Sequence, residues 1–317
     1  MRIGIDVMGG DFYPQAPVAG AVQARALWGH DAQLVLIGDA DIIRAELLRQ
    51  QQAESDFEIV HTSEIIGMDE HPAKAFTSKT DSSIHVGIRL HREKKIDAFI
   101  SAGNTGAMLV GSVLGLGNIN GVLRPTIGAL YPNQGGYSMI CDVGANADCK
   151  PEHLSQFALL GTLYMREVKG IQKPRVALLN VGEEKSKGSQ LAQAAYELLE
   201  KNNTLHFIGN AEGRDLNAGK ADVYVCDGYT GNIILKFAES FYDIFHERFP
   251  QDDLVGSFNF ERYGGLPVLG VKGVSIIGHG ISTPAAFLEM IRCARDVVHS
   301  GLIQKFEKAL LDHSQQT

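Results

Sequence analysis

The sequence has little of what marks several common protein classes. Only 4 of its 317 residues are cysteines, and their spacing matches neither a zinc site nor a disulfide framework. No two histidines stand four residues apart on an expected helix, so the sequence carries no signal for a zinc site. We therefore expect reduced thiols, no metal and no cofactor.

Charge and hydropathy exclude further classes. Lys and Arg total 29 against 37 Asp and Glu, a formal net charge of −8, whereas non-specific nucleic-acid binding normally requires a basic face. No apolar run approaches the length of a membrane-spanning helix, and the N-terminal MRIGIDVMGGD lacks the apolar core of a signal peptide. These features predict a cytoplasmic protein that does not bind nucleic acid.

The residues that are present favour an α/β fold. Hydrophobic residues make up 44% of the chain, enough for a substantial core. Short runs rich in β-branched residues alternate with helical patterns such as PEHLSQFALLGTLYMREV and SQLAQAAYELLEKN. This alternation predicts a mostly parallel sheet with helices on both faces. The expected strands are RIGIDVM, QLVLIG, FEIVHTS, IDAFISAG, YSMICDVG, PRVALLNVG, LHFIGN, ADVYVCDG and VSIIGHG.

The alternation extends over most of the chain without a repeat or a linker. A single α/β catalytic unit over residues 1–317 fits it best, with two lobes as the alternative. Two stretches, GLGNINGVLRPTIGALYPNQGGY and PQDDLVGSFNFERYGGLPVLG, are expected to be loop-rich excursions from this unit.

Polar, glycine-rich corners follow many of the expected strands. Ligands in open α/β sheets bind beyond the carboxyl ends of the strands, so we expect these corners to converge on one rim. One such corner is ordinary turn chemistry, but several with Asn, Asp, Thr, Ser, Lys and His predict a binding site. The corners are DVMGGD (6–11), SAGNTG (101–106), DVGANAD (142–148), NVGEEKSKG (180–188), CDGYTGN (226–232) and GHGIST (278–283).

The common motifs for nucleotide binding and hydrolysis are missing. The chain has no Gly-x-x-x-x-Gly-Lys-Ser/Thr, and no Gly-x-Gly-x-x-Gly follows its first strand. No Gly-x-Ser-x-Gly marks a hydrolase nucleophile. What remains is a site rich in backbone N–H donors and poor in nucleophiles, which suits phosphate as a reactant.

Seven motifs in this order resemble the bacterial acyl-acyl carrier protein:phosphate acyltransferase family over nearly the whole chain. They are IDVMGGD, SAGNTGAMLVG, DVGANADCKPEHL, LLNVGEEKSKG, FIGNAEGRDL, DGYTGNIILK and YGGLPVLGVKG. The resemblance implies a fold related to phosphotransacetylase and to the isocitrate and isopropylmalate dehydrogenases.

The resemblance also implies an activity and partners. A fatty acyl group would pass from acyl-acyl carrier protein to inorganic phosphate. The acyl phosphate would then serve glycerol-3-phosphate acylation in phospholipid synthesis, with a membrane-bound glycerol-3-phosphate acyltransferase as a further partner. Members of the family are homodimers.

By this resemblance, Lys187 and Asn232 are the candidate catalytic residues. Lys187 could hold phosphate or stabilise the leaving sulfur, and Asn232 could donate to the carbonyl oxygen. Each has a structural alternative: Lys187, like Lys185, could be a solvated loop lysine, and Asn232 could be a helix N-cap.

Other corner residues are candidates for binding phosphate or substrate. The SAGNTG corner could cradle phosphate on a helix N-terminus. The acids of the first corner would repel phosphate, so ordering of the loop is at least as good a role for them, and His279 could donate a proton or a hydrogen bond. The candidates are Asp6, Gly9, Gly10, Asp11, Gly103, Asn104, Thr105, Gly106, Asp142, Asn146 and His279.

Two rival functions are alternatives to the acyltransferase. An NAD-dependent hydroxy-acid dehydrogenase on the same fold would want an acidic metal cluster and an arginine clamp for a carboxylate, and no such cluster is evident. A non-catalytic regulator that binds acyl carrier protein would not need intact catalytic corners, whereas all the corner motifs are present in this sequence.

Residues 233–263 depart from the family pattern. They form a helical segment that varies among family members and is shorter here than in many of them. Many members carry a longer basic and apolar hairpin there, linked to dimer contact and membrane attachment. The expected helix IILKFAESFYDIFHERF has a phenylalanine stripe, but its acids outnumber its bases. We therefore expect at most weak, peripheral membrane association.

Overall fold

The structure, a computed structural model, describes residues 1–29 and 31–314 and contains two compact units. Unit 1 comprises residues Met1–Gly117 and Glu261–Ile303. Unit 2 comprises Asn118–Phe260 and the chain from Gln304 onward.

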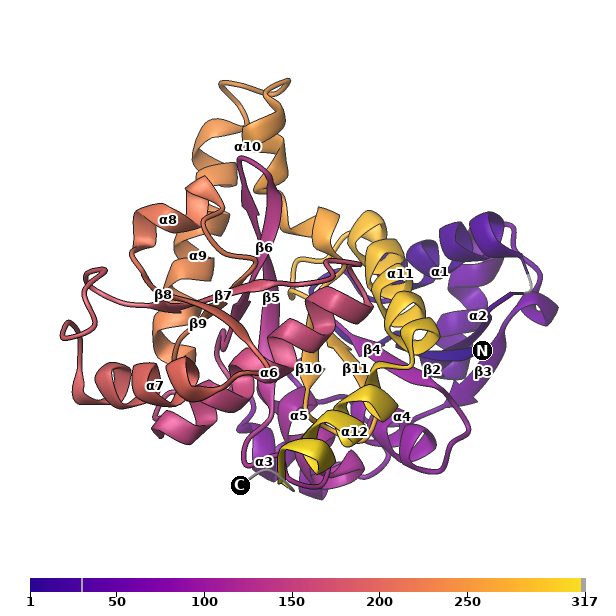
Figure 1. Ribbon diagram of the computed structural model, residues 1–317. Coiled ribbons are helices and arrows are strands. Elements are labelled where there is room, and N and C mark those ends of the chain that lie inside the picture. Colours follow the sequence, from indigo (N-terminus) through magenta and orange to yellow (C-terminus); the bar gives the residue numbers. More distant parts are fainter. Residues whose placement is uncertain (30, 315–317) are drawn as a thin grey trace. The chain divides into compact units, whose positions relative to one another are not determined.

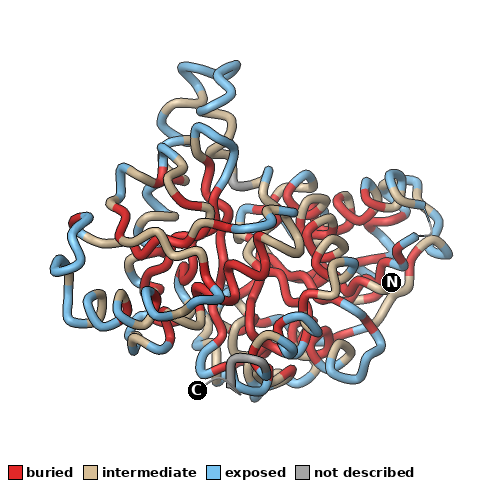
Figure 2. Tube along the Cα trace, viewed as in Figure 1, coloured by how far each residue is buried: buried red, intermediate tan, exposed pale blue. Residues whose placement is uncertain are grey.

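Unit 1 is built on strands that are almost all parallel, in the order β3-β2-β1-β4-β11-β10. Strands β1, β2, β3, β4 and β11 pair in parallel, and β10 is antiparallel to β11. β4 and β11 are buried along their whole length and β1 along all but its first residue, as expected for a sheet covered on both faces (Figure 2). Their bounds are β1 (Arg2–Asp6), β2 (Gln33–Gly38), β3 (Glu58–His61), β4 (Ala98–Ser101), β10 (Leu266–Leu269) and β11 (Val274–Ile277).

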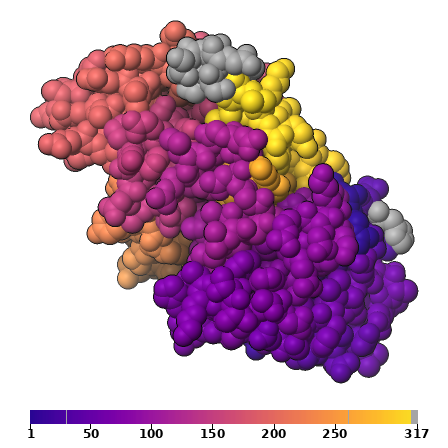
Figure 3. Space-filling model, turned by 90° about the horizontal axis from the view of Figure 1, so that it is seen from below, coloured from indigo at the N-terminus to yellow at the C-terminus, as the bar shows by residue number. Residues whose placement is uncertain are grey.

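Helices cover both faces of the unit 1 sheet. On one face α1 lies beside α11, and on the other lie α3, α4 and α5, of which α3 and α4 contribute to the purple surface of Figure 3 (Figures 1 and 3). The helices are α1 (Gln15–Trp28), α2 (Ala40–Arg49), η1 (Glu54–Asp56), α3 (Pro72–Ser78), α4 (Ser83–Arg92), α5 (Thr105–Val110), η2 (Gly111–Leu116) and α11 (Pro284–Ser300).

Unit 2 repeats this plan with strands in the order β5-β6-β9-β7-β8. Strands β6, β9, β7 and β8 are parallel, and β5 is antiparallel to β6. The strands are β5 (Thr126–Asn133), β6 (Gly136–Cys141), β7 (Arg175–Leu179), β8 (His206–Ala211) and β9 (Val223–Val225). The two parallel sets confirm the predicted α/β class.

Helices α6 and α7 pack together, with α6 on β6 and β9, whereas α8 and α9 pack against β5. The helices are α6 (Pro151–Glu167), α7 (Gln190–Lys201), α8 (Gly213–Ala218), α9 (Gly228–Phe245) and α10 (Asp253–Ser257). Two more, η3 (Phe260–Tyr263) and α12 (Leu302–Ser314), contain residues of both units. No helix in the described chain is long and apolar enough to span a bilayer.

All nine expected strands form, but the two expected loop-rich excursions are only partly loops. The first contains β5, and the second contains α10, η3 and β10. The sequence does not indicate β5 as a strand, because Gly128 and Pro132 are unusual in strands. A Cβ at Gly128 would lie 2.2 Å from Cε of Met139, so any larger residue there would require this methionine side chain to move.

Candidate functional site

Three of the glycine corners meet in unit 1. They follow β1, β4 and β11, which are adjacent strands of one sheet. A Cβ on Gly9 would lie 2.7 Å from the backbone nitrogen of Gly103, and the N–H of Asp11 donates to the Gly280 carbonyl at 2.7 Å. Gly10 has φ +92°, a conformation that favours glycine. The corners therefore touch through backbone where a side chain would not fit.

Asp6 orders the first of these corners from within. Its carboxylate is buried and accepts hydrogen bonds from Ser101 Oγ at 2.6 Å and from the Met8 N–H at 2.9 Å. Burial raises the pKa of Asp6 above its usual value, and the hydrogen bonds act in the opposite direction. This side chain faces the protein interior and not a ligand.

Asn104 also makes internal contacts. Its Oδ1 accepts from the Ala107 N–H and caps α5, while Nδ2 contacts the carbonyls of Gly67, Met68 and Glu70 at 3.0–3.2 Å. The amide thereby holds the 67–70 loop against the corner.

The remaining unit 1 candidates differ in exposure. Thr105 is exposed. Gly106 lies against Pro72, and a Cβ added at Gly106 would be 2.4 Å from Cγ of that proline. His279 is half-buried; its Nδ1 lies 3.4 Å from the Ile281 N–H, and its carbonyl accepts from the backbone and side chain of Ser282. Asp11 is exposed.

The other three corners meet in unit 2, after the adjacent strands β6, β9 and β7. A Cβ on Gly228 would lie 2.8 Å from both the Asn146 carbonyl and the Asp142 carboxylate. A Cβ on Gly231 would lie 1.9 Å from the Asp142 carbonyl oxygen. The first turns of α9 can therefore approach the 142–148 corner only because they carry glycine.

Asp142 is the centre of the 142–148 corner. Its Oδ1 accepts from the N–H groups of Ile127 and Ala145, and its Oδ2 from the backbone and side chain of Asn146 at 2.6 and 2.9 Å. The Asn146 amide also donates to the Pro125 carbonyl. Burial raises the pKa of Asp142, against the effect of these hydrogen bonds. Both side chains thus organise the loop.

Replacing Gly231 with alanine is expected to destabilise the protein. The added methyl group would meet backbone that cannot rotate away, and overpacking of this kind typically costs about 1–3 kcal/mol. The matched control is Gly213→Ala in the first turn of α8, where a Cβ meets nothing within 4 Å. Denaturant unfolding should show a loss only for Gly231→Ala, and equal stability of the two variants would contradict the close approach.

The structure distinguishes the two candidate lysines of the 180–188 corner. Lys185 forms an ion pair with Glu200, and its Nζ lies over the Tyr196 ring, 5.3 Å from the centroid. Lys187 is exposed, and its Nζ has no ion-pair partner within the described part of the chain. Asn180 fixes the backbone beside it by donating to the Lys187 carbonyl at 3.1 Å, and Gly188 follows with φ +91°. Lys187 is therefore the lysine available to a ligand.

Asn232 lies in the second turn of α9 and is exposed. The alternative that it caps this helix is wrong, because Asp227 is the N-cap and accepts from the Thr230 N–H at 2.8 Å. The Asn232 amide lies near Gly144: a Cβ added at Gly144 would be 3.7 Å from Oδ1 of Asn232. Among the described residues the amide has no hydrogen-bond partner, so its donors are available.

A pocket of about 270 Å³ joins the 180–188 and 226–232 corners. We name it the corner pocket. Gly188 and Thr230 line it, and these residues stand one and two positions from Lys187 and Asn232. Much of its wall is hydrocarbon, from Leu154, Leu178, Leu179, Leu191, Ala192 and Ile234.

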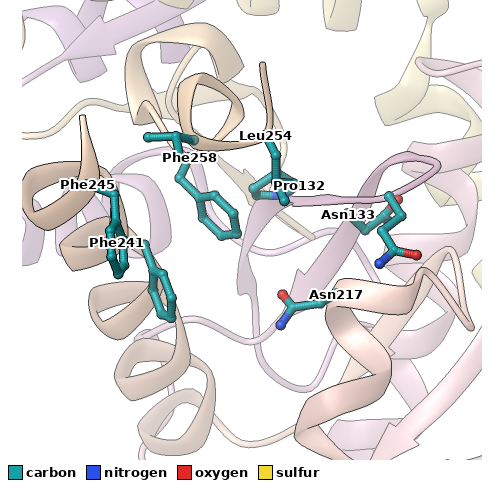
Figure 4. Close-up of a pocket in the computed structure, with 9 residues that line it drawn as sticks. Pro132, Asn133, Asn217, Phe241, Phe245, Leu254 and Phe258 are labelled. Carbon is teal, nitrogen blue, oxygen red and sulfur yellow. The ribbon is translucent and has the colours of Figure 1, made fainter. Parts of the chain in front are cut away.

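A second pocket of unit 2, of about 210 Å³, lies farther along α9. We name it the phenylalanine pocket, after Phe241, Phe245 and Phe258, whose rings surround it with Leu254 and Pro132 (Figure 4). Asn133 and Asn217 lie at its other side. None of the glycine corners contributes to it.

Three residues that organise the corners were not among the candidates. Ser101 binds Asp6, Asn180 binds the Lys187 carbonyl, and Asp227 caps α9. An Asp directly before a helix that begins with glycine is a signal for an N-cap, so Asp227 could have been found from the sequence. The partners of Ser101 and Asn180 depend on the fold. No group of three or more metal-ligating side chains occurs in the part of the chain described.

Comparison with known proteins gives a consistent result. A family model described as "Fatty acid synthesis protein" matches residues 1–305. A phosphate acyltransferase of Desulfitobacterium hafniense (strain DSM 10664 / DCB-2) is 42% identical, over 98% of this chain and 98% of the relative. One of Heliobacterium modesticaldum is 43% identical, over 99% and 97%.

Among solved structures, a phosphotransacetylase from Streptococcus pyogenes matches with a TM-score of 0.65 at 18% identity, covering 94% of each chain. At this identity the match concerns the fold alone. It confirms the expected relation to the phosphotransacetylase fold.

Proposed function

The chain belongs to the phosphate acyltransferase family, and on that premise we propose that it transfers a fatty acyl group from acyl-acyl carrier protein to inorganic phosphate. The observation that carries this proposal is identity of 40–43% to phosphate acyltransferases over essentially the whole chain. The product, an acyl phosphate, serves glycerol-3-phosphate acylation in phospholipid synthesis.

The reaction requires little from the protein as a nucleophile. A phosphate oxygen attacks the thioester carbonyl carbon, the C–S bond breaks, and the carrier's thiol leaves with a proton. Phosphate is already anionic near neutral pH, so the protein mainly positions it, offsets its charge and stabilises the oxyanion.

Lys187 and Asn232 are the proposed catalytic residues. The unpaired Nζ of Lys187 offsets the charge of phosphate or of the leaving thiolate, and the free amide of Asn232 donates to the oxyanion. Asp142 and Asn146 hold the backbone beside Asn232. In unit 1 the residues of the three corners bind substrate, with Asp6 and Asn104 ordering the loops.

The assay for this function is release of free thiol from an acyl carrier thioester. Release should require inorganic phosphate and proceed without NAD or magnesium. Turnover that needs NAD would favour the dehydrogenase, and tight binding of the thioester without turnover would favour the regulator.

We further propose a cytoplasmic homodimer that hands acyl phosphate to a membrane-bound glycerol-3-phosphate acyltransferase. Helix α9 exposes Phe237 at 65%. From the middle of α9 to just beyond its end, the acids Glu239, Asp243 and Glu247 outnumber the bases Lys236 and Arg248, so anionic headgroups repel this segment. Purified protein is expected to stay in the supernatant when spun with anionic liposomes at physiological salt. Co-sedimentation that Phe241→Glu abolishes, with the dimer intact, would overturn this.

A further inference from the structure

The corner pocket lies directly beside the proposed catalytic residues. Its floor includes Cys226, a buried side chain at the end of β9, and Leu178 of β7. Its walls come from the first turn of α7 and the first two turns of α9, where Ala192 and Ile234 line it. A substrate whose carbonyl meets Asn232 and whose phosphate partner meets Lys187 would have this pocket next to its reacting carbon.

The polar side chains that line the corner pocket are already engaged. Asn180 donates to the Lys187 carbonyl and accepts from Val181, and Ser189 accepts from the Ala192 N–H. Asp227 accepts from both the N–H and the hydroxyl of Thr230. The polar side chains of the wall are therefore committed to capping the helices and shaping the loop.

This commitment decides which ligand chemistry fits. Phosphate needs donors, and here the N-terminus of α9 is already capped by a carboxylate, Asp227, which repels an anion. A pantetheine arm brings amides that lose hydrogen bonds on entering an apolar wall. A hydrocarbon chain has no hydrogen bonds to lose, and it gains from burial against Leu154, Leu191 and Ile234.

We propose that the corner pocket receives the fatty acyl chain as it leaves the thioester and that the depth of the pocket sets the preference for chain length. The proposal rests on the proposed function, which supplies an acyl thioester. The pocket's volume of about 270 Å³ holds part of a long chain, and Val181, which is 79% exposed at its lining, extends the apolar wall outward.

The phenylalanine pocket is the competing location for an acyl chain. It is also apolar, but Phe241 stands seven residues beyond Ile234 on α9, which is about 10 Å along the helix axis. It lacks any residue of the six corners. It therefore provides the matched control.

The test measures kcat/KM for a series of acyl carrier thioesters from short to long chains. Ala192→Phe adds bulk to the wall of the corner pocket and should lower the ratio of long-chain to short-chain kcat/KM by about 10-fold or more, since one methylene of misfit is worth 10-fold or more. Val255→Phe, in the phenylalanine pocket, should leave that ratio unchanged. Melting temperatures check folding, and Ala192→Leu replaces Ala192→Phe if the larger side chain prevents folding.

Each outcome decides the matter. An equal loss for all chain lengths in the Ala192 variants would assign the pocket to pantetheine or to structure alone, and a ratio changed by Val255→Phe would assign the chain to the phenylalanine pocket; either result overturns the proposal. A parent protein that releases no thiol with any chain length would instead refute the proposed function, so the two failures are distinguishable.

Discussion

Lys187→Ala is expected to lower kcat/KM for phosphate-dependent thiol release by about 100-fold or more. The side chain is exposed and its Nζ is unpaired in the described structure, so its charge is available to the reaction. Loss of a group that stabilises developing charge typically costs about 10²–10³ in rate. The kinetics separate its two proposed roles: a raised KM for phosphate indicates phosphate binding, and a lowered kcat alone indicates help to the leaving thiolate.

The control for this variant is two residues away. Lys185→Ala removes the same charge from the same loop, but from a lysine that is paired with Glu200 and lies over Tyr196. Its activity should stay within about threefold of the parent, because the charge of Lys185 is already paired and is not available to the reaction. If the two variants lose activity equally, the loop acts through its overall charge and Lys187 has no specific role.

Asn232→Ala is expected to cost about 100-fold in kcat, because it removes a donor from the oxyanion. Asn232→Asp, which keeps the size and replaces the donor by a negative charge, should be at least as inactive. Both should keep the parent's melting temperature, since the side chain is exposed and does not cap α9. Lys236→Ala, one turn along the same helix, is the control. Activity within about threefold of the parent for both Asn232 variants would remove this residue from the mechanism.

The sequence was sufficient to predict the parallel strands and the helices α6 and α7. Their apolar, β-branched runs are local signals, and so are the residues that start the helices, Pro151 at the first position of α6 and Ser189 at the N-cap of α7. The antiparallel strands β5 and β10 carry Gly128, Pro132 and Pro267, and their pairing depends on partners that are not visible in the pattern. They could not be predicted by the same reasoning.

The corners show a similar limit. Their convergence follows from parallel strands, but which three corners follow adjacent strands depends on strand order, and strand order is set by tertiary packing. The choice between Lys185 and Lys187 depends on Glu200, which is fifteen residues away on α7 and reaches Lys185 only in the folded chain.

The order of strands in unit 2 has a consequence for biosynthesis. Strand β9 (Val223–Val225) pairs with β6 on one side and β7 on the other, although it is the last of the three to be translated. Translation proceeds at about 5–20 residues per second, so the edge of β6 that pairs with β9 stays unpaired for several seconds. An unpaired strand edge is prone to aggregation. A nascent chain arrested before residue 223 would hold the 142–148 and 180–188 corners without the strand that joins them. Ribosome-bound intermediates of that length are therefore the ones that should depend on a chaperone.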